Sequence, residues 1–505
     1  MKKSKVLGNS AANALSQVAV VLLSFITRTF FVKNIGIEYL GIYSTSVSIL
    51  NALSVTELGL TSAIIYCLYR PLEEKDTRRI NQYLSVYRVI YRCIGLFILC
   101  ASFICLPFLD RIMKGTQITP YVAVCFEIQA FSVAVSYFIS YKRTLLYADQ
   151  CEYISKATDV VFNAAVSFLN ILFMILCKSY LLYLFLLVVH AVGSNCFINH
   201  MVKKRYPYLA IVSFDRVICA ELFGKVKNIF VNKVAMFIYS STDNLLISAL
   251  IGTTQVGYLS NYASVISSLK YLVSCLLESA TPTIGHLAVD RNLLYEKEKK
   301  YRMLSQAAYI LGSSLFLGVF FCSDDFISLW LGEAYIMPGY VKGLMAVDAF
   351  FYAMQVPSFI YINACGIFET EKKISIFCTI CNIAVSLLLL RRAGLAGILT
   401  GTAVSQFFFW LLRSRCVFRS ALEEKGVRGW LRYWRENLIR CLLLTGQTWF
   451  LLHLNRPSFC RNTAVEMGWN IFLILATFSV LYFITQSRSR AHREMTQWIR
   501  NCLKH

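Results

Sequence analysis

The sequence predicts an all-α polytopic membrane protein with about 14 transmembrane helices. We expect two parallel six-helix lobes followed by a C-terminal helix pair. Three observations support this fold class: the composition, a series of long apolar segments and an internal repeat. Of the 505 residues, 57% are hydrophobic and only 15% are charged, whereas about a quarter of the residues are charged in a typical soluble chain. This composition excludes a soluble enzyme and also a disordered or fibrous chain.

The apolar segments define the individual elements. A transmembrane helix needs roughly 20 mostly apolar residues, and about 14 segments of the chain meet that requirement. In the first lobe they cover residues 10–32, 40–65, 84–108, 118–141, 157–177 and 180–199. In the second lobe they cover 228–251, 256–284, 303–322, 340–367, 374–390 and 395–412, and the final pair covers 437–454 and 467–485.

The distribution of Lys and Arg predicts the orientation. With a cytoplasmic N-terminus, the inner loops carry about 35 basic residues and the outer loops about nine, and basic residues concentrate in cytoplasmic loops. Both termini are therefore expected in the cytoplasm, which requires an even number of helices. We interpret the net charge of +22 as the result of basic cytoplasmic loops and of an anionic substrate. No nucleic acid partner is expected. The basic N-terminus is too long for a signal peptide, so we expect it to remain as the first helix.

An internal repeat predicts the two lobes. The string IGIEYLGIYSTS, which begins at Ile35, recurs as IGTTQVGYLSNY, and Gly41 falls on Gly257. Each copy follows the first helix of its lobe, as expected after duplication of a six-helix unit. The predicted domains are an N-terminal lobe at residues 1–215, a C-terminal lobe at residues 216–424 and a final segment at residues 425–505. The final segment holds an interfacial helix around Trp430 and Trp434, the last two spans and a basic tail.

Polar residues in the first predicted helix indicate a cavity lining. Asn13, Gln17, Ser24 and Arg28 fall within about 60° of one another on a helix. Ionisable groups inside spans are costly and are usually functional or paired. We interpret this stripe as a substrate-binding surface with a cation in its outer half. A packed helix contact, or an Arg28 side chain that extends to the membrane surface, is the alternative.

The first helix of the second lobe is also polar. It carries Asn232, Lys233 and Asp243, and the last two are too far apart on one helix to pair directly. Each therefore needs a partner elsewhere, a water-filled cavity or a bound ligand. Glu57 and Lys270 are further candidates for buried, substrate-binding charges.

Arg88 and Arg92 are one helical turn apart near the cytoplasmic end of the third predicted helix. They form a candidate mouth for an anion, and anchoring at the membrane surface is an equal alternative. The sequence contains no catalytic constellation, no metal-ligand cluster and no nucleotide-binding motif. We therefore expect no enzymatic activity, no cofactor and no metal.

Several strings together resemble a known family. They are IGIEYLGIYS after Arg28, LSVTELGLTSAI with Glu57 and Gly59, LSNY, SATPTIG, FISLWLG and GLAGILTGTAVSQ. In this order, over residues 1–415, the chain resembles the Wzx-like polysaccharide flippases of the multidrug/oligosaccharidyl-lipid/polysaccharide exporter (MOP) superfamily. The resemblance implies a MATE-like fold.

The resemblance also implies a function. Such proteins move a polyprenyl-diphosphate-linked oligosaccharide from the inner to the outer leaflet of a bacterial plasma membrane, for O-antigen, capsule or exopolysaccharide. Membrane lipids would surround the protein, and a coupling ion (H+ or Na+) and the polysaccharide polymerase machinery are candidate partners. A diphosphate favours fixed cations in a low-dielectric cavity, which Arg28, Lys233 and Lys270 would supply.

Two other functions remain open. A multidrug antiporter of the same superfamily would share the fold and bind organic cations, for which Glu57 and Asp243 are suitable. A membrane polysaccharide polymerase or ligase is less favoured, because it needs a sizeable external loop and the predicted external loops are short.

Overall fold

The computed structural model describes residues 20–57, 60–149, 151–213, 215–220, 222, 242–278, 281, 284, 294–422, 426–454 and 463–486. Every regular element in these ranges is a helix. The chain forms two compact units, Met1–Gly257 and Tyr258–His505, and each is described separately. The boundary between them falls inside helix α11 (Thr253–Glu278). The predicted domain boundaries at residues 215 and 424 stay predictions.

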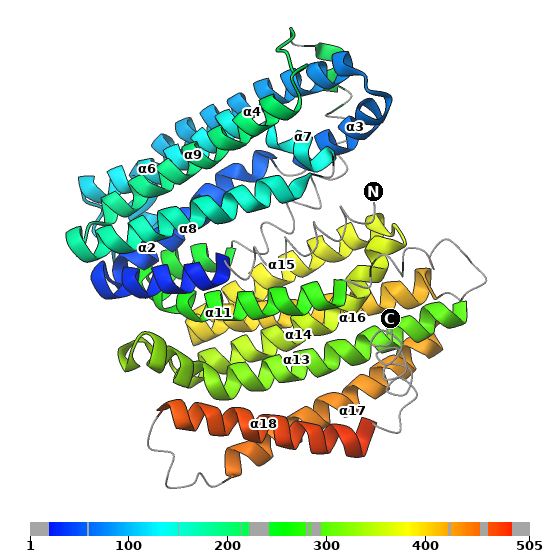
Figure 1. Cartoon of the computed structure of the whole chain (residues 1–505). Helices are drawn as coiled ribbons and strands as arrows, with labels where there is room; N and C mark the ends of the chain where they lie inside the picture. The colour runs from blue at the N-terminus through cyan, green and yellow to red at the C-terminus, as the bar shows by residue number, and fades with distance from the viewer. Residues whose placement is uncertain are drawn as a thin grey trace. The chain divides into compact units, whose positions relative to one another are not determined.

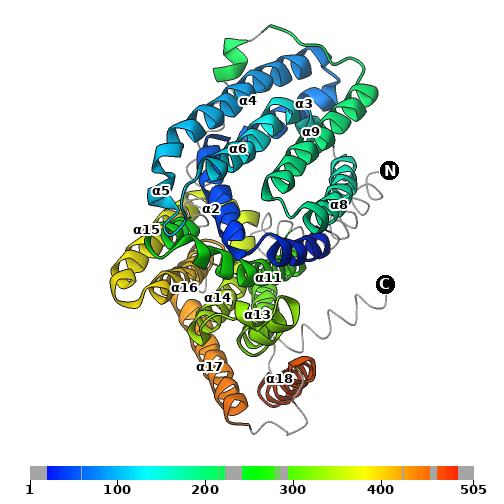
Figure 2. The same ribbon diagram turned by 90° about the vertical axis from the view of Figure 1, so that its left-hand side faces the viewer.

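The first unit begins with helical residues 20–34 and continues through six longer helices. These are α2 (Ile37–Leu53), α3 (Leu60–Glu74), α4 (Thr77–Cys105), α6 (Pro120–Ser140), α8 (Glu152–Cys177) and α9 (Tyr180–Arg205). Shorter elements connect them: η1 (Ser54–Glu57), η2 (Leu106–Phe108), α5 (Leu109–Ile112) and α7 (Arg143–Ala148). Helix α6 packs against both α4 and α9, and α8 packs on α9 (Figures 1 and 2).

Local signals determine where several of these helices begin. Thr119 caps α6, where its side chain accepts a hydrogen bond from the Val122 amide, and Pro120 occupies the first turn. Ser179 caps α9 in the same way, and Asp76 caps α4. Such caps satisfy amide groups that have no partner within the helix.

The structure corrects one predicted element. Residues 40–65 were expected to form a single span, but α2 ends at Leu53 and is followed by the 3-10 turn η1. The Ser54 hydroxyl donates a hydrogen bond of 2.9 Å to the Leu50 carbonyl oxygen, a local bond of the kind that bends or interrupts a helix. Glu57 is the last residue of this turn, so its carboxylate projects from an irregular stretch of backbone.

The second unit contains the remainder of α11 and further long helices. They are α13 (Leu294–Trp330), α14 (Gly339–Ala364), α15 (Phe368–Ala393), α16 (Leu395–Ser420), α17 (Gly426–His453) and α18 (Thr463–Gln486), with the short η4 (Glu333–Tyr335). Helix α14 packs against α13 and α16, α15 packs on α16, and α18 packs on α13 (Figure 1). Trp410, Tyr301 and Tyr361 are fully buried in the core of this unit.

The aromatic segment around Trp430 and Trp434 belongs to α17 and does not form a separate helix. Both indole nitrogens donate to the Ser414 hydroxyl of α16, at 3.1 and 3.2 Å. These hydrogen bonds and the surrounding rings fix the first turns of α17 against α16.

The helices display large apolar side chains on their outer faces. Among the described residues, eight helices are long and apolar enough to cross a membrane. Leu96 and Phe103 of α4, and Phe168 and Leu176 of α8, are exposed. Apolar surface of this extent is suited to contact with lipid. The predicted all-α membrane fold is therefore confirmed, while the count of about 14 spans is approximate.

Candidate functional site: a polar cavity in the first unit

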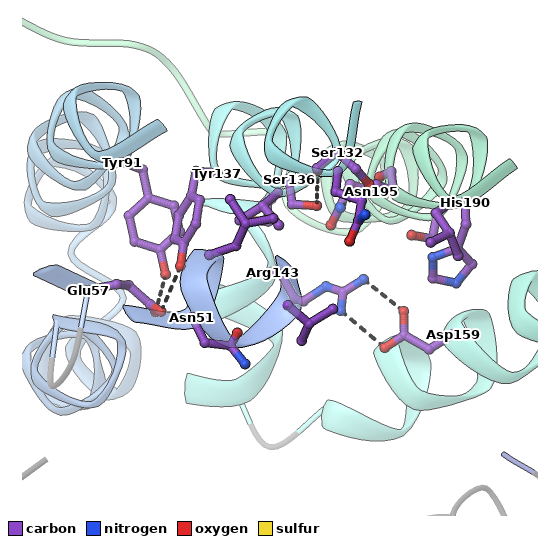
Figure 3. A pocket seen from close by; sticks show the side chains of 18 of the residues that line it. Asn51, Glu57, Tyr91, Ser132, Ser136, Tyr137, Arg143, Asp159, His190 and Asn195 are labelled. Atoms are coloured by element: carbon purple, nitrogen blue, oxygen red, sulfur yellow. Dashed lines mark hydrogen bonds and ion pairs between the residues drawn. The ribbon is translucent and has the colours of Figure 1, made fainter. Parts of the chain in front are cut away.

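A cavity of about 550 Å³ lies inside the first unit, within the size range of ligand pockets. Its walls come from α2, η1, α4, α6, α7, α8 and α9 (Figure 3). Many lining side chains are polar: Tyr43, Asn51, Glu57, Tyr91, Gln129, Ser132, Ser136, Tyr137, Ser140, Arg143, Asp159, His190, Ser194 and Asn195.

Glu57 forms the centre of a hydroxyl cluster at one side of the cavity. Its Oε1 accepts hydrogen bonds from the Thr61 hydroxyl and, at 2.8 Å, from Tyr91 Oη. Its Oε2 accepts a hydrogen bond of 3.3 Å from Tyr137 Oη, and Tyr87 Oη lies 3.0 Å from the Thr61 hydroxyl. No Lys or Arg in the described residues forms an ion pair with Glu57. Neutral O–H groups therefore hold this carboxylate.

Arg143 and Asp159 form an ion pair at the other side of the cavity (Figure 3). The pair is bidentate: Nη1 donates to Oδ2 at 3.0 Å and Nη2 to Oδ1 at 2.9 Å. The side chains are 20% and 26% exposed. Arg143 Nε and His190 Nε2 are buried and lack a hydrogen-bond partner in the part of the chain that the structure describes. A bound polar ligand or water would satisfy these two atoms.

Hydroxyl and amide groups lie between these two charged regions. Ser136 donates to the Ser132 carbonyl oxygen at 3.1 Å, and Asn195 donates to the Ala191 carbonyl oxygen at 2.8 Å. Gln129 donates to Tyr180 Oη at 3.0 Å, while its Oε1 is buried and accepts no hydrogen bond from the described residues. The middle of the cavity thus offers neutral acceptors and donors of the kind that bind a polyhydroxylated ligand.

Arg28 lies beside this cavity. It is partly buried on helical residues 20–34, and the phenol groups of Tyr43 and Tyr183 lie close enough to interact with its charge. The rings of these two tyrosines are 5.9 Å apart, and Tyr43 also lines the cavity. Ser24 is exposed, and its hydroxyl donates to the Val21 carbonyl oxygen at 2.7 Å. Ser24 and Arg28 are the two described residues of the predicted polar stripe, and of these two Arg28 lies near the cavity.

The other predicted site residues lie elsewhere. Arg88 and Arg92 of α4 lie near Tyr141, beyond the cavity lining. Asp243 lies in helical residues 242–250 and does not line the cavity. Four predicted residues lie outside the described ranges: Asn13, Gln17, Asn232 and Lys233.

Lys270, another predicted site residue, forms an ion pair with Asp348 in the second unit. Its ammonium group also lies 5.2 Å from the centre of the Tyr352 ring. The charge of Lys270 is therefore already balanced by a neighbouring carboxylate and an aromatic face.

Two more ion pairs of the second unit follow the same pattern. Lys342 pairs with Asp324. Arg413 of α16 pairs with Glu371 of α15, and their side chains are only 4% and 2% exposed. The Arg413 guanidinium also lies over the Phe409 ring, 4.3 Å from its centre.

Sequence reasoning identified Glu57 but missed Arg143, Asp159 and the tyrosine hydroxyls. Asp159 carried a signal, because it is a carboxylate inside the predicted span 157–177. Arg143 carried none, because it follows the predicted span 118–141 and reads as an ordinary basic loop residue.

Solved structures show which class of fold this is. An inward-facing MATE-family multidrug resistance transporter of the MOP superfamily matches with a TM-score of 0.63 and 14% identity, over 82% of this chain and 100% of that chain. The lipid II flippase MurJ, in an inward closed conformation, matches with a TM-score of 0.66 and 12% identity, over 94% and 99%. A eukaryotic MATE transporter matches with a TM-score of 0.59 and 15% identity, over 85% and 98%. The protein is thus a multi-pass membrane protein with the same fold as these solved structures.

A family model described as polysaccharide biosynthesis protein matches residues 6–288, more than half of the chain. The chain belongs to this polysaccharide biosynthesis protein family. Among curated protein sequences, no significant match is found.

Proposed function

We propose that the protein is a flippase that moves a polyprenyl-diphosphate-linked oligosaccharide from the inner to the outer leaflet by alternating access. The observation that carries this proposal is the combination of a polysaccharide biosynthesis family with a transporter fold. The solved structure described as a lipid II flippase has the same fold, which supports the movement of a lipid-linked substrate.

The chemistry of the cavity supports a glycan as part of the substrate. Hydroxyl and amide groups line it, and sugars bind through many such hydrogen bonds. Arg28, beside the cavity wall at Tyr43, is the proposed contact for the diphosphate, because a guanidinium group binds phosphate oxygens in a bidentate manner. Lys233 is the second proposed cation.

The proposal includes a location and partners. We place the protein in a bacterial plasma membrane with both termini in the cytoplasm, in the biosynthesis of a surface polysaccharide such as O-antigen, capsule or exopolysaccharide. An H+ or Na+ gradient is the proposed source of energy, and the polysaccharide polymerase is the proposed consumer of the flipped product.

One observation favours a second candidate function, a multidrug or cation antiporter. Glu57 lines the cavity and is held by hydroxyl groups, with no cation paired to it in the described chain. A carboxylate in that environment suits an organic cation.

A leaflet assay tests the proposal. Purified protein is placed in liposomes with a fluorescent polyprenyl-diphosphate oligosaccharide, and an impermeant quencher is added outside. We expect the protected half of the signal to disappear quickly with wild type and about tenfold more slowly with Arg28→Gln, as loss of a charged hydrogen bond predicts. Lys33→Gln is the matched control, because Lys33 is exposed on the same helix.

Two outcomes would contradict this account. Uptake of a cationic dye against a proton gradient, without flipping of the lipid, would establish the antiporter. Flipping by Arg28→Gln at the wild-type rate would remove Arg28 from the diphosphate site while leaving the flippase intact.

A further inference from the structure

Basic side chains from three parts of the first unit lie near Tyr141 and Lys142, which directly follow α6. The Arg88 guanidinium lies 5.9 Å from the centre of the Tyr141 ring, and the Lys142 ammonium lies 5.7 Å from it. Arg92 is close enough to influence the Tyr141 hydroxyl, and Lys203 is close enough to influence Lys142. We refer to Arg88, Arg92, Lys142 and Lys203 as the Tyr141 cation cluster.

Helix packing and one hydrogen bond hold the cluster together. The Asn199 side chain of α9 donates a hydrogen bond of 2.9 Å to the Ile139 carbonyl oxygen in the last turn of α6. This bond fixes the end of α9, which carries Lys203, next to the end of α6, which leads into Lys142. Helix α4 packs along α6 and supplies the two arginines. The cluster is therefore built on three packed helices.

The charges in the cluster repel one another. The pKa of Lys142 is lowered, first by burial and then by the neighbouring charges of Lys203 and Arg88. Holding like charges together in a partly buried place costs free energy. A general preference for basic residues at the cytoplasmic side explains their number, but it does not explain why Arg88 and Lys142 lie over the same ring.

Acidic residues in the segments that follow Lys142 already have partners. Asp159 is paired with Arg143. Asp149 is paired with Arg205 and also accepts a hydrogen bond of 2.6 Å from Tyr206. No carboxylate in the described ranges forms an ion pair with a member of the cluster. The positive charge of the cluster is thus available to an external anion.

We propose that the Tyr141 cation cluster is a binding site for the phosphate group of a lipid. Two guanidinium forks and two ammonium groups match the several oxygens and the multiple negative charge of a phosphate. Ser140 and Arg143, which flank Tyr141 and Lys142 in the chain, both line the cavity. A phosphate held here therefore lies at the rim of the cavity, and its lipid chain can stay in the bilayer.

Two lipids share this chemistry. One is the diphosphate of the lipid-linked saccharide, in which case the inference rests on the proposed function and makes the cluster the place where substrate is first bound. The other is an anionic phospholipid of the surrounding membrane. Both sources place a phosphate group against the same four side chains, and the experiment distinguishes them.

The test measures lipid binding by the full-length purified protein in detergent. The probes are a polyprenyl diphosphate without sugar, phosphatidylglycerol, and phosphatidylcholine as the zwitterionic reference. The variant Arg88→Gln/Lys142→Gln should weaken binding about tenfold or more, as expected for lost charged hydrogen bonds. The matched control is Arg78→Gln/Arg79→Gln. It removes two exposed charges from α4, the helix that carries Arg88, and should change the affinity for lipid by less than about twofold.

Each result has a defined meaning. Weakening for the polyprenyl diphosphate alone identifies the substrate as the ligand, and weakening for phosphatidylglycerol identifies a membrane phospholipid. Wild-type protein that binds neither probe above phosphatidylcholine overturns the proposal, as does equal affinity of the two double variants.

A conservative variant separates charge from folding. Lys142→Arg keeps the charge and should bind as wild type. If lipid binds at the cluster but no lipid is flipped in liposomes, the flippase proposal fails and the phosphate site stands.

Discussion

Gly41 of α2 lies directly against Gly257 in the first turns of α11. A Cβ atom on Gly41 would be 2.2 Å from the Thr253 carbonyl oxygen, and a Cβ atom on Gly257 would be 2.6 Å from the Ile37 carbonyl oxygen. The internal repeat aligns Gly41 with Gly257 and Ile37 with Thr253. Within the first unit, each glycine therefore approaches the carbonyl oxygen of the residue four positions before the other glycine.

This contact predicts a strong effect of adding one methyl group. Gly41→Ala and Gly257→Ala place a side chain on backbone atoms that cannot move independently, so each should destabilise the protein by about 1–3 kcal/mol. The measurement is the midpoint of thermal unfolding of purified protein in detergent. Gly446→Ala in α17 is the control, because no atom lies within 4 Å of its added Cβ. Equal midpoints for all three variants would contradict the close approach.

The Arg413–Glu371 pair predicts a coupled loss of stability. Arg413→Gln or Glu371→Gln alone leaves a charge in a nearly inaccessible place, and breaking a buried pair costs about 3–5 kcal/mol. The double variant Arg413→Met/Glu371→Met removes both charges and should lose much less than the sum of the single variants. A double-mutant cycle on the thermal midpoint measures this coupling. Additive losses would show that the two charges act separately.

Substitution of Glu57 distinguishes the two candidate functions. Glu57→Gln removes the charge but keeps the size of the side chain. If the substrate is an anionic lipid, flipping should remain within about twofold of wild type, whereas an antiporter should lose cation transport by about tenfold or more. The matched control is Glu127→Gln, a carboxyl of the same unit that does not line the cavity. Slower lipid flipping in Glu57→Gln alone would mean that the carboxylate holds the glycan.

Lys142 predicts a dependence of stability on pH. Its pKa is lower in the folded protein than the ordinary value of 10.5, so the unfolded chain binds more protons between the two pKa values. The free energy of unfolding should therefore rise as the pH rises through the lowered pKa. Lys142→Gln removes the repulsion at neutral pH and should raise the thermal midpoint by about 1 °C. Thermal unfolding of wild type between neutral pH and pH 10.5 tests the first statement, and a midpoint that falls over this range would contradict it. A lower midpoint for Lys142→Gln than for wild type at neutral pH would contradict the second.

Most of the helices could be predicted because their signals are local. The spans predicted to begin at residues 180 and 395 coincide with the starts of α9 at Tyr180 and α16 at Leu395. The break at η1 was not predicted, because continuous apolar character favoured one helix. Hydrogen bonds from Tyr91 and Tyr137, on two other helices, hold Glu57 at that break.

The candidate site could be predicted only in part. A charged residue within an apolar segment, such as Glu57, is visible in the sequence. The partners of such residues are not visible, because they depend on packing. Lys270 meets Asp348 across 78 positions of the chain, and Arg143 of α7 meets Asp159 of α8 across 16 positions. The sequence therefore shows which charges must be accommodated, and the fold decides which of them are balanced.

The ion pairs of the second unit restrict how this protein can diverge. Three pairs are concerned: Lys270–Asp348, Lys342–Asp324 and Arg413–Glu371. Substitution of one residue of a pair leaves the other charge without its partner and destabilises the protein. During evolution, either a less stable variant must be tolerated or both residues of the pair must be substituted together. Glu57 is held by hydroxyl groups, and no Lys or Arg paired with it among the described residues has to change at the same time. Relatives should therefore differ at these pairs by compensated double substitutions and at Glu57 by single ones.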